Sequence, residues 1–394
     1  MSSNDDIFKK LVETTEKQFT KKHKDTEVKF AYACDEKPPT GLIVDNPLLE
    51  FVLDRRYMAY GRFYLLYGHK GSCKTSLFYD FAKMFQRNNG KVIWLETENA
   101  IDLDYAKNQG VDLSSVFLVH PPSLEAAINL SEMYIRNLSK MDPEGQMPIL
   151  ICLDSIAGSV TEYEQDSSNN MTSMVPGTHA RLLSRFYREM EQPLANERCV
   201  FLALNQQKHK IGGFGFGEQI SMMGGEAPMF SSTYQWKMNF MGALEKKNEH
   251  GADRKYGSKH KIVCTRNKLG REGSSQEIEF DLYIKGGIDW YSPLARKLGK
   301  EYDTLVKKEG SRYSWLLPNM TYIDKEGNEQ PIDVEAAMSE KELGYILANS
   351  VQAKETIRTA FEIPPLPSTE EIEEVEKERL NKRKKKKEKE EKDL

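Results

Sequence analysis

Residues 61–76 read GRFYLLYGHKGSCKTS, and this stretch determines the predicted fold of the whole chain. The apolar run 63–67 has the length and the β-rich composition of a buried strand. A short glycine-bearing loop follows it, and from Leu77 onward apolar residues recur at helical spacing. A strand, a glycine loop and a helix in this order form a phosphate-binding loop, in which backbone N–H groups and the positive helix end bind phosphate oxygens.

Two side chains at the predicted helix start carry the phosphate chemistry. We expect Lys74 to reach the β and γ oxygens of a nucleoside triphosphate and the Thr75 hydroxyl to bind Mg²⁺. One position departs from the usual G-x-x-x-x-G-K-[ST] pattern, because Cys73 stands where a glycine precedes the lysine. Its Cβ must point away from the nucleotide or lower the affinity. The other loop residues expected to surround the nucleotide are Gly68, His69, Lys70, Gly71, Ser72 and Ser76.

Strand and helix patterns alternate on the C-terminal side of this loop. Further strand patterns occupy 91–96, 116–119, 148–153 and 200–204, with helical patterns between them. Strand patterns resume at 236–240 and 260–265, with a basic segment at 246–261 between them. This alternation predicts an α/β fold with a mostly parallel sheet that is flanked by helices on both faces. Ligands of such sheets bind at the carboxyl ends of the strands.

Polar residues at these strand ends extend the predicted site. Asp154 follows the strand 148–153, where a Walker B carboxylate would bind the magnesium ion held by Thr75. The strand 91–96 runs into Glu96-Thr97-Glu98, and a carboxylate beside the γ-phosphate can orient or deprotonate the attacking water. Gln206 is placed to sense the γ-phosphate and opens a glycine-rich loop, so nucleotide state could set the order of that loop.

The composition bounds the class of protein. The chain has 394 residues, 39% of them hydrophobic, and a net charge of −4, so any nucleic-acid site must be a local patch or loop. Five scattered cysteines without CxxC spacing predict reduced thiols in an intracellular protein. No stretch approaches the roughly 20 apolar residues of a membrane span, and the N-terminus has no apolar signal segment. We therefore expect a cytoplasmic protein without membrane contact.

Changes in composition divide the chain into four predicted parts. These are an N-terminal arm (1–36), an α/β core (37–292), a small C-terminal domain (293–365) and a charged tail (366–394). The arm combines an amphipathic helix at 7–19 with a strand at 26–34, and either another subunit or its own domain could receive them. We expect a solvated, mobile tail, with contact to DNA or a partner as the alternative.

Six segments together resemble the RecA-type DNA recombinases in order and approximate spacing, over about residues 49–291. They read GHKGSCKTS, LETENAIDLDYAKNQGVDL, ILICLDSIAG, FLALNQQKHKIGGFGFG, GGEAPMFSS and VCTRNK. The substituted glycine before the loop lysine makes the chain most similar to the phage UvsX branch of that family. The resemblance implies a RecA-like ATPase core that uses ATP and Mg²⁺, in the host cytoplasm if the protein is phage-encoded.

The resemblance also implies roles for single residues. Glu98 matches the catalytic glutamate, with Glu96 as a supporting carboxylate, and Asp102 and Tyr105 match residues that contact the adenine. Basic residues in CTRNK match a pair that reaches the ATP of a neighbouring subunit, so hydrolysis would require a filament. The first of them, Arg266, departs from the lysine of the family. The residues thereby assigned to catalysis are Lys74, Glu98, Gln206, Arg266 and Lys268.

Two long loops, 161–176 and 207–225, correspond to the DNA-binding loops of the family. Ile211 matches an apolar residue that wedges between base triplets, with Met174 or Val175 as its partner from the first loop. The other expected DNA contacts are Arg181, Arg185, Arg188, Lys208, Lys210, Gly212, Gly213 and Phe214, although packing of Phe214 on the domain is an equal alternative. A second, duplex-binding patch would comprise Lys246, Lys247, Arg254, Lys255, Lys259 and Lys261, unless these residues are merely solvated.

The preferred prediction is an ATP-dependent strand-exchange recombinase. It would form a helical filament on single-stranded DNA, pair this strand with homologous double-stranded DNA, and work with single-strand-binding and mediator proteins. One alternative is a hexameric helicase of the same fold, against which the LETENAID block and the paired loops argue. The other is a slow or inactive ATP-binding DNA filament protein, in which Cys73 has suppressed hydrolysis.

Overall fold

The computed structural model describes residues 4–22, 39–165, 177–209, 220–247, 253–271 and 276–392. The chain separates into two compact units, Met1–Pro39 and Thr40–Leu394. The described part of the first unit is the helix α1 (Asn4–Lys22), which confirms the predicted helix at 7–19. The strand predicted at 26–34 lies outside the described residues.

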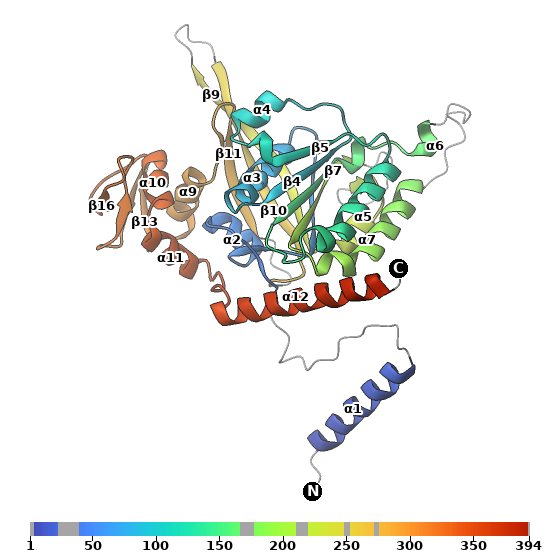
Figure 1. Cartoon of the computed structure of the whole chain (residues 1–394). Coiled ribbons are helices and arrows are strands. Elements are labelled where there is room, and N and C mark those ends of the chain that lie inside the picture. Colours follow the sequence, from blue (N-terminus) through green and yellow to red (C-terminus); the bar gives the residue numbers. More distant parts are fainter. Residues whose placement is uncertain are drawn as a thin grey trace, which may run out of the picture. The chain divides into compact units, whose positions relative to one another are not determined.

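The larger unit is built on a sheet of ten strands, as far as the described residues show (Figure 1). Its order is β12-β11-β10-β9-β3-β7-β6-β4-β5, and β8 pairs with β7. The strands β9, β3, β7, β6, β4 and β5 run parallel, whereas β9 to β12 follow one another as antiparallel neighbours. This mixed, mostly parallel sheet confirms the predicted α/β class. The bounds are β3 (Arg62–Gly68), β4 (Lys91–Glu96), β5 (Val116–Val119), β6 (Ile149–Asp154), β7 (Cys199–His209), β8 (Ile220–Met222), β9 (Tyr234–Lys247), β10 (Asp253–Asn267), β11 (Glu277–Tyr283) and β12 (Gly287–Asp289).

Two apolar cores cover the two faces of this sheet, because successive side chains of a strand point to opposite faces. On β7, Val200 and Leu202 belong to one core, whereas Cys199 and Phe201 belong to the other. Helix α3 (Lys74–Arg87) buries its apolar side in the first core. Helices α5 (Leu124–Met141) and α7 (Thr178–Ala195) lie together over the second (Figure 1). Within the described residues, no helix is both long and apolar enough to cross a membrane.

The antiparallel hairpin β9–β10 is longer than the sequence patterns at 236–240 and 260–265 predict. The basic segment expected between two short strands is therefore itself largely β-structure, and the hairpin extends beyond its neighbours at the top of Figure 1. Charged residues alternate there on a ribbon with little buried surface, which hides the usual apolar period of a strand.

Short elements complete the core. They are β1 (Gly41–Ile43), β2 (Tyr57–Ala59), α2 (Pro47–Leu53), α4 (Leu103–Asn108), α6 (Glu162–Gln165) and α8 (Ala227–Ser231). The C-terminal part consists of α9 (Tyr291–Glu301), β13 (Val306–Glu309), β14 (Arg312–Trp315), β15 (Thr321–Ile323), β16 (Glu329–Pro331), α10 (Glu340–Ala348) and α11 (Val351–Ala360). Arg358 of α11 forms a buried ion pair of 2.6 Å with Glu50 of α2, which fastens this part to the core.

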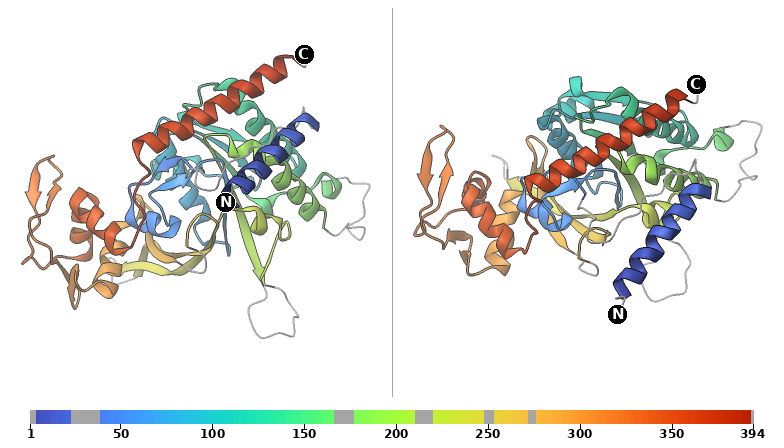
Figure 2. Two further views of the ribbon diagram at one scale, coloured as in Figure 1. Left: turned by 90° about the horizontal axis from the view of Figure 1, so that it is seen from below. Right: turned by 60° about the horizontal axis from the view of Figure 1, so that its bottom comes forward.

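The charged tail forms the helix α12 (Thr369–Lys392), visible as one long rod in both views of Figure 2. Its Arg379 guanidinium lies 5.8 Å from the ring centre of Tyr60, and Glu376 pairs with Arg198 at 4.0 Å. The helix agrees with the helix-prone composition, and mobility of the tail stays a prediction.

Candidate functional site

Four parallel strands bring the predicted site residues to one edge of the sheet. In register, Gly68 of β3 stands opposite Gln206 of β7, and Glu96 of β4 stands opposite Asp154 of β6. The loops that follow these strands therefore leave the sheet side by side. The structure thus gathers the phosphate-loop residues, Asp154, Gln206 and the loop that carries Glu98 at the carboxyl edge.

The phosphate loop is open on the side of its glycine. Gly71 adopts a φ of +78°, and an added Cβ would meet no heavy atom of the described residues within 4 Å. The Lys74 ammonium donates hydrogen bonds to the carbonyls of Gly68 at 3.3 Å and His69 at 3.0 Å, so it lies over the loop. Burial lowers the pKa of Lys74. Phosphate oxygens would give this ammonium a negatively charged partner and so favour its protonated form.

Cys73 occupies the position that usually requires glycine. Its φ of 73° is in the left-handed region, which a side chain tolerates at a cost of roughly 1–2 kcal/mol. The side chain packs against the apolar core that α3 shares with Tyr105, and burial raises the pKa of the thiol to about 11. A neutral thiol packed on the core favours the expectation that Cys73 points away from the nucleotide.

Thr75 and Asp154 form the candidate magnesium site. The Thr75 hydroxyl donates to Asp154 Oδ2 at 3.2 Å. Burial, followed by the nearby charge of Glu98, raises the pKa of Asp154 to about 7. A bound cation would favour the charged form of Asp154 against both burial and the charge of Glu98, so the residues fit Mg²⁺. No group of three or more His, Cys, Asp and Glu side chains among the described residues is arranged to hold a metal.

The Glu98 carboxylate is held at the centre of this edge. Its Oε1 accepts hydrogen bonds from the Ser155 hydroxyl at 2.5 Å and from the Gln206 amide at 3.0 Å. Gly158 leaves room for it, because a Cβ there would lie 2.3 Å from Glu98 Cγ. The structure therefore requires glycine at position 158 for a reason that the sequence pattern did not reveal.

A second carboxylate, Glu96, supports the Glu98 loop from inside the protein. It is 3% exposed, and its oxygens accept backbone N–H groups of Glu98, Asn99 and Ala100 at 2.9, 3.0 and 3.3 Å. His120 Nδ1 lies 3.1 Å from Glu96 Oε2. Sequence reasoning did not assign His120 a role, although it directly follows the predicted strand 116–119 at a strand end.

The predicted adenine contacts lie beside the phosphate-loop helix. Asp102 caps α4 by accepting the Tyr105 N–H at 2.8 Å. The Tyr105 ring lies 6.2 Å from the ring of Tyr79 on α3, and its hydroxyl interacts with Ser76. These contacts place an aromatic face next to the phosphate loop, as base stacking requires.

The structure places Arg266 and Lys268 away from the nucleotide edge of their own chain. The Lys268 N–H donates to the Thr233 carbonyl, and the Thr233 N–H donates to the Phe63 carbonyl near the start of β3. Arg266 pairs with Gln235, which stands opposite Leu65 in the middle of β3. Lys268 Nζ donates to the Ser231 carbonyl at 3.1 Å, and Arg266 donates to α8 carbonyls at 3.4 Å. Both side chains therefore bond α8 in this structure, and neither bonds a described residue of the phosphate loop.

The three arginines assigned to DNA lie on α7. Arg181, Arg185 and Arg188 share one side of the helix by their spacing, and Arg185 forms an exposed ion pair with Glu189 at 2.8 Å. The backbone of Lys208 pairs with β8, but its side chain is outside the described residues. Also outside them are Met174, Val175, Lys210, Ile211, Gly212, Gly213 and Phe214.

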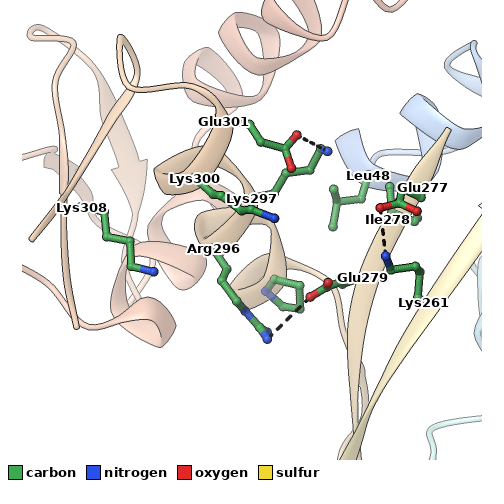
Figure 3. A pocket seen from close by; sticks show the side chains of 11 residues that line it. Leu48, Lys261, Glu277, Ile278, Glu279, Arg296, Lys297, Lys300, Glu301 and Lys308 are labelled. Carbon is green, nitrogen blue, oxygen red and sulfur yellow. Dashed lines mark hydrogen bonds and ion pairs between the residues drawn. The ribbon is translucent and has the colours of Figure 1, made fainter. Parts of the chain in front are cut away.

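The candidate duplex-binding lysines are split between two places. Lys246, Lys247, Arg254 and Lys255 lie on the outer part of the β9–β10 hairpin. Lys261 instead pairs with Glu277 at 2.9 Å and lines a pocket of about 280 Å³ (Figure 3). Helix α9 and β13 add the further cations Arg296, Lys297, Lys300 and Lys308 to this pocket. Sequence reasoning missed them, because only the fold brings α9 beside β10 and β11.

Comparisons with known proteins agree with this geometry. The RecA N-terminal domain family matches residues 41–289, from the first residue of β1 to the last of β12. Protein RecA of Bartonella quintana is 28% identical over 285 residues, which cover 71% of this chain and 74% of the relative. Protein RecA of Helicobacter acinonychis is 29% identical over 309 residues (78% and 81%), and that of Bordetella pertussis is 27% identical over 289 residues (72% and 76%).

Proposed function

Because this chain belongs to the RecA family, we propose that it is an ATP-dependent DNA recombinase. It assembles as a helical filament on single-stranded DNA, pairs that strand with a homologous duplex, and hydrolyses ATP at the interfaces between subunits. The hydrogen bond between Gln206 and Glu98 carries this proposal, since it joins the hydrolytic carboxylate to β7, the strand that leads into the glycine-rich segment. Nucleotide state and DNA-loop order then depend on one contact.

The hydrolytic step follows from the residues at the strand ends. The phosphate loop and Lys74 would bind the triphosphate, and Thr75 with Asp154 would hold Mg²⁺, which would neutralise phosphate charge. Glu98 accepts a proton from the attacking water or orients it. Asp102 and Tyr105 hold the adenine.

The position of Arg266 and Lys268 supports hydrolysis between subunits. A chain that holds these cations on the carbonyls of α8 can offer them to the nucleotide of a neighbour. Such cations neutralise the charge that develops on the γ-phosphate in the transition state. The exposed apolar residues Phe8 and Leu11 of α1 would add the oligomerisation arm to the same interface.

DNA would be held at two sites. The α7 arginines and the two loops, with Ile211 as the wedge, contact the primary strand through phosphates and splayed bases. The basic residues on the outer part of the β9–β10 hairpin contact the incoming duplex through its phosphates. Single-strand-binding and mediator proteins, action in the cytoplasm and membership of the phage UvsX branch stay predictions.

Strand exchange between circular single-stranded DNA and a linear duplex tests the proposal. We expect joint molecules with a homologous duplex and none with a heterologous one. Glu98→Gln is expected to retain ATP-dependent binding to single-stranded DNA while turnover falls about 100-fold or more. Glu144→Gln, in an exposed turn, is the matched control and should behave as the wild type. Unwinding of duplex without homology would support the helicase, and DNA binding without any turnover the inactive filament.

A further inference from the structure

We propose that His120 is a positioning residue for ATP hydrolysis, which acts through Glu96 on the backbone that carries Glu98. The inference rests on the proposed function, in which Glu98 activates the attacking water. His120 itself lies at the end of β5, one strand beyond β4, and donates no hydrogen bond to Glu98. Its role is to hold the Glu96 carboxylate in place, and this carboxylate in turn holds the loop that carries Glu98.

Glu96 is the centre of this arrangement. Its buried carboxylate takes four donors: Oε1 accepts the N–H groups of Glu98 and Ala100, and Oε2 accepts the N–H of Asn99 and faces His120 Nδ1. A carboxylate oxygen only accepts, so Nδ1 of His120 carries the hydrogen. Three consecutive backbone amides on one side chain leave the loop little freedom to rotate about that carboxylate.

The loop has a second, independent anchor on the other side. The Thr97 hydroxyl donates to the Ser155 carbonyl at 2.8 Å and accepts the Ser155 N–H at 3.0 Å. Thr97 thus ties the loop to the end of β6, and Glu96 with His120 ties it to the end of β5. The Glu98 side chain between these anchors is contacted by Ser155 and Gln206.

The electrostatics of the site explain why the fourth donor matters. Glu96 lies close enough to Asp154 to contribute to the raised pKa of that residue, and Glu98 contributes more strongly. Without His120, Oε2 of Glu96 would keep only the Asn99 N–H, in a region already rich in carboxylates. Because His120 is half exposed whereas Glu96 is buried, the histidine can be replaced without opening the core.

Three substitutions separate the donor from the rest of the side chain. In His120→Asn the amide nitrogen takes the place of Nδ1, in His120→Gln it takes the place of Nε2, and His120→Ala has no donor. We expect the kcat for DNA-stimulated hydrolysis to fall roughly 10-fold in His120→Ala and His120→Gln, in the range of one lost hydrogen bond to a charged group. His120→Asn should stay within about threefold of the wild type.

Binding measurements separate a positioning role from a structural one, because a loss of structure would also lower the affinity for nucleotide and DNA. The affinity for a non-hydrolysable ATP analogue and for single-stranded DNA should stay within about twofold in all three variants, since the phosphate loop is unchanged. Wild-type kcat in His120→Ala would overturn the inference, as would equal losses of kcat in His120→Asn and His120→Ala. A wild-type protein without DNA-stimulated hydrolysis would overturn the proposed function instead, so the two failures are distinguishable.

Discussion

The amide of Gln206 lies 3.0 Å from the carboxylate of Glu98, although 108 positions separate them in the sequence. The contact exists because β7 and β4 both flank β6 and end at the same edge of the sheet. Gln206 lies on β7, the strand that leads into the glycine-rich segment, and Glu98 stands beside the candidate magnesium site. A change in the position of either side chain therefore alters the hydrogen bond to the other. Such a shared contact is the physical requirement for coupling between sites.

Substitution of Gly158 tests the placement of Glu98. A Cβ at this position would lie 2.3 Å from Glu98 Cγ, so the glutamate must move away. We expect Gly158→Ala to lower kcat about 10-fold or more, by displacing the carboxylate from the water it activates. Nucleotide affinity should change little, because the phosphate loop is separate. Wild-type kcat in Gly158→Ala would show that the position of Glu98 is not critical.

The raised pKa of Asp154 predicts a pH dependence of stability. Burial raises the pKa of Asp154 from its ordinary 3.8 to about 7 in the folded protein, so between pH 4 and 7 the folded state holds a proton that the unfolded state has lost. The contribution of Asp154 to the free energy of unfolding therefore falls as the pH rises through this window. Asp154→Asn removes this pH-dependent contribution. The free energy of unfolding of the variant, relative to that of the nucleotide-free wild type, should therefore increase by about 2 kcal/mol from pH 5 to pH 8. Urea unfolding at both pH values measures this, and a difference that does not change with pH would contradict it.

Cys73 offers a chemical test of the phosphate loop. Its thiol, with a pKa of about 11, is almost fully protonated at pH 7 and should react slowly with iodoacetamide. We expect the rate, followed by mass spectrometry of the peptide that contains Cys73, to rise about tenfold per pH unit between 7 and 9. Cys73→Ala should keep the nucleotide affinity within about twofold, since the side chain packs on the core. A rapid reaction at pH 7, or a large loss of affinity in Cys73→Ala, would place the sulfur at the nucleotide.

Mixed filaments test whether Arg266 acts on a neighbour. Glu98→Gln and Arg266→Ala should each be nearly inactive alone. In a mixture, some interfaces join an intact Glu98 of one subunit to an intact Arg266 of the next, so part of the DNA-stimulated hydrolysis should return. Glu98→Gln mixed with Lys74→Ala is the control that should restore less, because neither partner offers a complete nucleotide site. No recovery in the first mixture would contradict hydrolysis between subunits.

Much of the fold followed from local patterns. The strand predicted at 63–67 corresponds to β3 (Arg62–Gly68), and the helix after the loop corresponds to α3, because apolar periodicity reports a buried strand and an amphipathic helix directly. The strand-end rule also brought Glu98, Asp154 and Gln206 together, since parallel strands share one carboxyl edge.

The remaining site residues depend on strand order, which local sequence does not encode. His120 meets Glu96 only because β5 lies next to β4, and Thr97 meets Ser155 only because β6 lies on the other side of β4. The pairing of Arg266 with Gln235, in register with Leu65 of β3, depends on the antiparallel path of β10. The wedge Ile211 and its loop partners lie outside the described residues and stay predictions.

The most direct test of the central claim is ATP hydrolysis with and without single-stranded DNA, measured across protein concentration. We expect strong stimulation by DNA and a steep dependence on protein concentration, because each active site is completed by the next subunit on the strand. A rate that is independent of DNA and proportional to protein concentration, or no hydrolysis at all, would contradict it.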